Sequence, residues 1–184
     1  MPNTTTDGRA ILRDASARYR TSSREESGAR GAFDAETKRS GGAPRVEVAI
    51  RRDSAPADVA QLLGAEAVVV RARAMYNGDT LVQLVDTFIP VDIAMLVPAV
   101  EQADTGVGGI ISRFAEAGLA QTEVTEDVTL VEASAEQAAA LGVEPGSKLL
   151  QILHVGRTEK GTTVEVTRHI LSAGWTLRYS VPVA

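Results

Sequence analysis

The sequence predicts an α+β domain in which an antiparallel β-sheet is flanked by helices. One observation is the order of the segments: short stretches with alternating apolar residues are joined by glycine-bearing turns, with helix-like stretches between them. The other is an internal repeat. Leu63-Gly64 begins a stretch that ends with residues 78–89, and Leu141-Gly142 begins a similar one that ends with residues 161–171. Each copy has a helix end, a strand, a turn and a second strand, so two similar hairpins are expected in one sheet.

Turn and capping signals set the limits of the individual elements. Asn77-Gly78 is the strongest hairpin signal, because these residue types tolerate the positive φ of a tight turn. Ser54 or Asp58 is expected to cap the first helix after residue 45, and Ser134 to cap the last one. The expected strands span residues 46–51, 67–75, 81–89, 122–131, 149–155, 163–171 and 177–181. The expected helices run through residues 59–63, 109–117 and 134–141, and glycines at 64, 118 and 142 end them; residues 94–100 are expected to form a short apolar helix or a turn.

Composition excludes several classes of protein. The 184 residues suffice for one domain with an additional arm, and 44% hydrophobic residues are typical of a globular chain. Without cysteine there are no disulfides or thiolate metal sites, and two histidines cannot build a His-rich metal centre. No apolar run approaches the ~20 residues of a membrane span, and the N-terminus has no signal-like core. We therefore expect a cytoplasmic protein with no cofactor, no metal and no membrane contact.

Residues 1–44 are expected to form an N-terminal arm or linker, and residues 45–184 a ligand-binding domain. Residues 1–8 are small and polar, which predicts disorder. Residues 9–45 carry eight arginines and one lysine against five acids, and residues 14–31 have helical character broken by glycines. The arm is expected to lie on the domain or on a partner subunit. A tail that contacts nucleic acid is the alternative, although the interleaved acids and the net charge of −5 weaken it.

Strand alternation collects polar side chains on one face of the expected sheet. Arg71 and Arg73 point the same way along their strand. In the repeat Val82 aligns with Val164. Polar residues share a face within two further strands: Gln83 and Thr87 in one, and Glu165, Thr167 and His169 in the other. A solvated sheet face would explain this pattern. Two arginines near a glutamate and a histidine also suit an anionic or polyhydroxy ligand.

A glycine-rich turn precedes the helix expected at 109–117. Residues 104–109 include Gly106, Gly108 and Gly109. Glycines at a helix start leave backbone N–H groups unobstructed, and the helix dipole favours a negative charge there. The spacing is neither a Walker motif nor a dinucleotide fingerprint. The turn is either a flexible connection or, beside the two arginines, a candidate anion cradle.

Several separated segments resemble the UTRA domain, the effector-binding half of GntR/HutC-type transcription regulators. Residues 70–73 (Val-Arg-Ala-Arg), Gly78 and residues 88–90 are similar to its first hairpin, and residues 138–146 and 161–165 are similar to its later part. The resemblance covers about residues 45–181. It implies a chorismate lyase-like fold, a small metabolite held by the sheet, and a homodimer. It also implies ligand roles for Arg71, Arg73 and Glu165, and for Gly108 and Gly109.

The sequence departs from the family in two respects. Family regulators carry an N-terminal winged helix, and the short arm is not long enough to contain one, so no direct DNA binding by this chain alone is expected. Gln83, Val85 and Asp86 stand where relatives often carry a glutamate, and Leu171 near a frequent tyrosine. These changes leave the chemistry of the ligand open, and they are compatible with a ligand less polar than a sugar phosphate.

Three functions remain open at the level of sequence. The first is a sensor domain whose ligand-binding residues are Arg71, Arg73, Gln83, Gly108, Gly109, Glu165, Thr167 and His169. The second is a cofactor-independent lyase, dehydratase or cyclase on the chorismate lyase-like fold. There Glu165 would be the base, His169 or His154 the acid, and the two arginines would hold developing negative charge. His154 is otherwise expected to be a satisfied core histidine. The third is a dimerisation module without a ligand.

Overall fold

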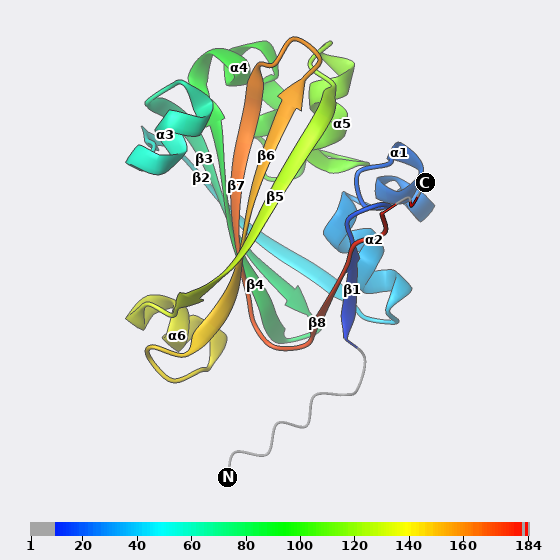
Figure 1. Ribbon diagram of the computed structural model, residues 1–184. Helices are drawn as coiled ribbons and strands as arrows, with labels where there is room; N and C mark the ends of the chain where they lie inside the picture. Colours follow the sequence, from blue (N-terminus) through cyan, green and yellow to red (C-terminus); the bar gives the residue numbers. More distant parts are fainter. Residues whose placement is uncertain (1–9, 182, 184) are drawn as a thin grey trace.

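The computed structural model describes residues 10–181 and 183 (Figure 1). The disorder expected for residues 1–8 lies outside the described residues. The elements, in order, are β1 (Ile11–Asp14), α1 (Thr21–Arg24), η1 (Glu26–Gly28), α2 (Ala32–Arg39), β2 (Pro44–Ser54), α3 (Ala57–Leu63), β3 (Ala67–Asn77), β4 (Thr80–Pro90), α4 (Val91–Leu96), η2 (Pro98–Glu101), α5 (Gly109–Glu116), β5 (Gln121–Glu132), α6 (Ala135–Leu141), β6 (Lys148–Thr158), β7 (Thr163–Leu171) and β8 (Trp175–Arg178). The α+β class is confirmed. No helix in this part of the chain is long and apolar enough to cross a membrane.

Six strands form an antiparallel sheet in the order β2-β3-β4-β7-β6-β5. The two hairpins expected from the repeat, β3–β4 and β6–β7, therefore meet at its centre through β4 and β7 (Figure 1). The register that aligns Val82 with Val164 also aligns Asp86 with Arg168, and these two residues are partners in the β4–β7 pairing. The repeat is thus a local two-fold relationship within one sheet. In the same register His154 occupies the position in the second hairpin that Arg73 occupies in the first.

The two faces of the sheet are covered by different elements. On one face α3 packs mainly on β7, and α6 packs on β4, so the helices follow the same two-fold relationship. Val68, Val70, Phe88 and Val166 form the core under α3. On the other face, α4, η2 and α5 cover one end, where Phe114 and Val164 are buried in a second core. The polar face predicted from alternation is therefore not a solvated surface.

Residues 10–43, called the N-terminal segment below, cover the rest of this second face (Figure 1). β1 pairs in parallel with β8 to form a separate two-stranded sheet. Phe33 of α2 packs with Ile11 and Met75, and with the ring of Trp175. The last strand expected at 177–181 is present as β8, but it begins earlier, ends at Arg178 and pairs with β1 outside the six-stranded sheet. The interrupted helical character expected at residues 14–31 corresponds to turns and the short α1 and η1.

Helix ends show which capping signals operate. Ser134 caps α6 in a capping box with Gln137, and Gly64 and Gly142 end α3 and α6 in the left-handed conformation, as expected. Neither Ser54 nor Asp58 caps α3, because Pro56 is its N-cap residue and Asp58 lies inside the first turn. The short helix or turn expected at 94–100 begins earlier, at Val91, and is interrupted before Pro98, where η2 begins.

Candidate ligand-binding site

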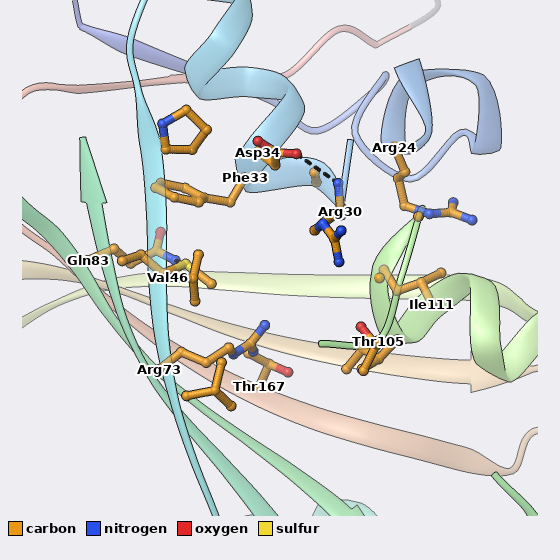
Figure 2. A pocket seen from close by; sticks show the side chains of 18 of the residues that line it. Arg24, Arg30, Phe33, Asp34, Val46, Arg73, Gln83, Thr105, Ile111 and Thr167 are labelled. Carbon is orange, nitrogen blue, oxygen red and sulfur yellow. Dashed lines mark hydrogen bonds between the residues drawn. The ribbon is translucent and has the colours of Figure 1, made fainter. Parts of the chain in front are cut away.

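A cavity of about 800 Å³ lies between the polar face of the sheet, the N-terminal segment and α5. Figure 2 shows Arg73 and Thr167 pointing into it from the sheet, with Phe33 and Asp34 of α2 on one side and Ile111 of α5 on another. Its wall includes all eight residues predicted as ligand contacts: Arg71, Arg73, Gln83, Gly108, Gly109, Glu165, Thr167 and His169. The sheet residues among them come from β3, β4 and β7, so strand alternation brings them to one face as expected.

Arg73 presents a positive charge to the cavity. It lies at the middle of β3 opposite Val85, and one guanidinium nitrogen donates a hydrogen bond to the hydroxyl of Thr87. Within residues 10–181 and 183 it forms no ion pair, although Glu165 and Asp86 are close enough to influence its charge. Burial lowers the pKa of Arg73, because the nearby acids only partly offset the loss of hydration, and its Nε is buried without a hydrogen-bond partner among the described residues. A bound anion would supply the remaining compensation.

Arg71 has a different environment from Arg73. Its guanidinium donates hydrogen bonds to the backbone carbonyls of Val100, Gln102 and Ala103, at 2.6 Å for Gln102 and 3.2 Å for Ala103. Burial, followed by repulsion from Arg73, lowers the pKa of Arg71 to about 10. The side chain lines the cavity while it fixes the loop after η2. Arg71 therefore has a structural role in the cavity wall. The guanidinium of Arg73 makes fewer hydrogen bonds within the protein than that of Arg71 does.

Glu165 is a buried carboxylate held by three neighbours. Oε1 accepts a hydrogen bond from Gln121 at 2.7 Å, and Oε2 accepts one from Thr167 at 3.3 Å. Nε2 of His154 lies 3.3 Å from Oε1, within ion-pair distance but too poorly aligned for a hydrogen bond. Burial opposes ionisation, but His154, Gln121 and Arg73 outweigh it and lower the pKa of Glu165 below its ordinary value. A carboxylate stabilised in this way is a weak general base.

His169 is a neutral donor or acceptor at the cavity wall. Burial, followed by the charges of Arg13, Arg18 and Arg73, lowers the pKa of His169 well below 6.5. Its Nδ1 lies 3.2 Å from Nε2 of Gln83. If Gln83 donates to this nitrogen, the ring proton is on Nε2 and is available to a ligand. His169 therefore presents a neutral hydrogen-bonding group, and not a charge, to the cavity.

The glycine-rich turn is used for packing. The N–H of Gly108 donates to the carbonyl of Ala29 at 2.9 Å, and that of Gly109 to Gly106 at 3.2 Å. A Cβ on Gly108 would approach Oγ of Ser112 to 2.0 Å, and one on Gly109 would lie 3.1 Å from the carbonyl of Arg30. Both glycines line the cavity, but they do so because the N-terminal segment passes close to them. Their N–H groups are already bonded to backbone carbonyls, unlike those of an open anion cradle.

Sequence reasoning missed a polar cluster between the N-terminal segment and the far strands of the sheet. The hydroxyl of Tyr19 contacts the carboxylate of Glu126 and lies 3.0 Å from Nδ1 of His154. Arg13, which is 2% exposed, pairs with the same carboxylate. His154 is thus buried, as expected, but among the described residues only its Nδ1 has a hydrogen-bond partner, and the ring faces the cavity side of the sheet. The alternation of β5 places Glu126 on that face, and this was the available signal.

Buried arginines also attach the N-terminal segment to itself and to α5. Arg18 forms two hydrogen bonds to the carboxylate of Glu36, at 2.9 and 3.0 Å, and both side chains are buried. Arg24 donates to Ser112 at 3.2 Å, and Ser112 donates to Glu25 at 2.8 Å. These arginines are enclosed and not displayed to solvent, which does not suit a tail that contacts nucleic acid.

The arrangement can bind an anion and offers little for catalysis. Among the described residues Arg24, Arg71 and Arg73 line the cavity without an ion-pair partner; Arg71 is occupied by three backbone carbonyls and Arg24 by Ser112, so Arg73 is the least occupied of the three. Among the described residues no group of three or more histidine or acidic side chains could hold a metal ion. Glu165 and His169 share a face, as predicted, but each is engaged by its own partners. The site therefore resembles a recognition site more than a proton-transfer site.

Comparisons with known proteins agree with this geometry. The profile of the UTRA domain matches residues 39–173. The crystal structure of a protein assigned to the GntR family of transcriptional regulators is similar, with a TM-score of 0.72 and 21% identity; the match covers 82% of this chain and 63% of that chain. The ligand-binding domain of a protein assigned to the same family, from Bordetella bronchiseptica, has a TM-score of 0.62 and 25% identity and covers 77% of this chain and 92% of its own.

The effector domain of PhnF from Mycobacterium smegmatis shows the same fold at lower identity. Its TM-score is 0.70 at 18% identity, and the match covers 84% of this chain and 97% of that domain. No functionally curated protein gave a sequence match. Because the family profile extends over most of the chain and the similar structures share its fold, the chain belongs to the UTRA domain family.

Proposed function

We propose that this chain is the effector-binding domain of a GntR/HutC-type transcription regulator and that it senses a small anionic metabolite. The observation that carries the proposal is Arg73, whose guanidinium faces the cavity without an ion-pair partner among the described residues. An anion placed there would bind by a charge-assisted hydrogen bond, which is about twice as strong as a neutral one. Thr167 and His169 would add neutral hydrogen bonds on the same face.

The apolar part of the cavity wall limits the kind of anion. Phe33, Val46, Met75 and Ile111 lie around the polar groups. A ligand that carries its charge at one end and an apolar or weakly polar body at the other would use both sets. This favours a ligand less polar than a sugar phosphate, such as a small carboxylic acid with a hydrocarbon portion.

The N-terminal segment contributes to the proposed site. We treat residues 45–184 as the ligand-binding domain and propose that residues 10–43 act as its covering wall, because Arg18, Tyr19 and Phe33 line the cavity. A ligand could then stabilise one position of this segment relative to the sheet. We further propose that the protein acts as a homodimer in the cytoplasm, where a transcription regulator must work.

A thermal-shift screen of small carboxylates and organic phosphates tests the proposal. A ligand present at 100 times its dissociation constant stabilises the folded protein by about 2.7 kcal/mol. Arg73→Ala should weaken such binding about tenfold to a hundredfold, the value of a lost hydrogen bond to a charged group. The matched control is Arg168→Ala, because Arg168 lies on the opposite face of the sheet and pairs with Asp58.

Two results would contradict the proposal. If Arg73→Ala binds a stabilising compound as tightly as the wild-type protein does, the anion does not bind at Arg73. If a bound compound is converted into a product, and Glu165→Gln abolishes the conversion, the chain is an enzyme and not a sensor.

A further inference from the structure

We propose that the exposed strand β2 is a self-complementary interface, which pairs antiparallel with β2 of a second copy around a two-fold axis at Ala49. This interface gives a specific form to the homodimer proposed above, but it lies at the edge of the sheet and does not depend on the identity of the ligand. The argument uses the direction of the free backbone groups, the charges along the strand and a comparison with the opposite edge.

The backbone of β2 has one side available for pairing. β2 is 11 residues long, and within residues 10–181 and 183 its only neighbour in the sheet is β3. Gly78 donates to the carbonyl of Ala43, and Ala55 donates to that of Glu66, one bond at each end of the β2–β3 pairing. Hydrogen-bonded pairs alternate along an antiparallel ladder. The backbone N–H and C=O groups of the odd-numbered residues of β2 therefore bond to β3, and those of the even-numbered residues point away from the sheet, toward a second strand. Pro44, which has no N–H to donate, occupies an outward position.

The outward residues restrict the register of a second strand. The residues with free backbone groups, which must bond to one another across the axis, are Val46, Val48, Ile50 and Arg52. Each bonded pair therefore joins two even-numbered residues, and the two residue numbers of a pair always have an even sum. With the axis at Ala49, Val48 faces Ile50 of the second copy and Val46 faces Arg52. The odd-numbered side chains on the opposite face of the sheet then form non-hydrogen-bonded pairs, whose side chains approach most closely.

The charges of β2 match in this register. On the face away from the cavity the strand presents, in order, Arg45, Glu47, Ala49, Arg51 and Asp53, all of them exposed. Around Ala49, Glu47 faces Arg51 of the second copy and Arg45 faces Asp53, each twice by symmetry. Moving the axis to Val48 would oppose Arg45 to Arg51, and moving it to Ile50 would oppose Glu47 to Asp53. Of these three registers, only the one at Ala49 brings opposite charges together throughout, and its axis lies at the middle of the 11-residue strand.

The opposite edge of the sheet lacks this complementarity. β5 is 12 residues long and carries Glu123, Glu126, Asp127 and Glu132 with no lysine or arginine. Two copies of β5 would bring like charges together, which is a common way in which proteins protect an edge strand. The two edges thus differ in a manner that permits pairing through β2 and opposes it through β5.

Charge reversal with rescue tests this interface. We expect sedimentation velocity to show a dimer for the wild-type chain at micromolar concentration. Glu47→Arg or Arg51→Glu alone replaces two attractive contacts by two repulsive ones, and should raise the dimer dissociation constant about tenfold or more. An equimolar mixture of the two single variants should form a mixed dimer, and the double variant should recover self-association. Glu132→Arg, at the other edge of the sheet, is the control for a change of net charge.

A disulfide test reports the register directly. The chain contains no cysteine, so Ala49→Cys introduces a single thiol. In the proposed register this residue faces itself with Cα atoms about 4.5 Å apart, which suits a disulfide. Oxidation should give a covalent dimer, whereas Thr129→Cys on exposed β5 should not. A monomeric wild-type protein, single reversals that remain dimeric, or a mixture that does not associate would each overturn the proposal, with circular dichroism confirming that the variants are folded.

Discussion

The hydroxyl of Tyr19 lies 3.0 Å from Nδ1 of His154, and the same hydroxyl contacts the carboxylate of Glu126. The tyrosine belongs to the N-terminal segment, and the other two residues belong to β6 and β5. Arg13 reaches the same carboxylate from β1. This cluster therefore joins the covering segment to the part of the sheet that is farthest from β2, and its rings also stack, with centroids 5.3 Å apart.

Tyr19→Phe should loosen the N-terminal segment without unfolding the sheet. The change removes the hydroxyl and leaves the buried carboxylate of Glu126 and Nδ1 of His154 without this hydrogen-bond partner. Such a loss lowers the free energy of unfolding by about 1–3 kcal/mol. Urea denaturation measures the loss, and hydrogen exchange should rise mainly in residues 10–43. Tyr179→Phe is the matched control, because Tyr179 is 51% exposed. Equal effects of the two substitutions would show that the cluster contributes nothing specific.

His169 should make the protein less stable as the pH falls below 6.5. Burial lowers the pKa of His169 well below that value in the folded state, whereas the unfolded chain takes up a proton near 6.5. Because the unfolded state then binds more protons, stability is full above pH 6.5 and decreases as the pH falls toward the folded-state pKa.

The measurement is the unfolding free energy of wild-type protein and His169→Gln over this interval. The variant should show a smaller decrease with falling pH. The pH dependence of the His169 ring signal in nuclear magnetic resonance provides a second readout. A ring that titrates at 6.5 in the folded protein would contradict the burial described here.

Glu165 should contribute in a more acidic interval. Its neighbours lower its pKa below the ordinary 4.5, so its stabilising contribution is complete above pH 4.5 and is lost as the pH falls through the folded-state pKa. Glu165→Gln should therefore differ from wild type most at neutral pH, and the difference should narrow in acid. Glu123→Gln, at a carboxylate that is 64% exposed, provides the comparison. A difference that stays constant with pH would show that Glu165 is not ionised in the fold.

Sequence patterns predicted the sheet and its polar face for identifiable reasons. The repeat of hairpins is local, and alternation along β3, β4 and β7 fixes which side chains share a face. Alternation alone therefore predicts that Arg73, Thr167 and His169 lie on one face of the sheet, and all three line the cavity. The same rule applied to β5 would have added Glu126.

The N-terminal segment could not be predicted from the same signals. Its attachment depends on Arg13, Arg18 and Tyr19, whose partners lie far away in the sequence or on a short helix without a clear apolar face. Charged residues usually indicate a solvated surface, and only their tertiary partners make them buried. The parallel pairing of β1 with β8 could not be predicted either, because the two strands lie at opposite ends of the chain and no local pattern joins them.

Gly108→Ala tests whether the glycine-rich turn serves packing. Gly108 has φ of 80°, and a Cβ there would approach Ser112 Oγ to 2.0 Å and Glu25 Oε1 to 2.7 Å. Gly161 has nearly the same φ, 79°, but no atom within 4 Å of its Cβ position, so Gly161→Ala carries the same backbone strain without the collision. Strain alone costs about 1–3 kcal/mol. Gly108→Ala should lose more stability than this control in urea denaturation and should release residues 10–43 to hydrogen exchange. If both substitutions have the same effect, the turn does not hold the N-terminal segment against α5.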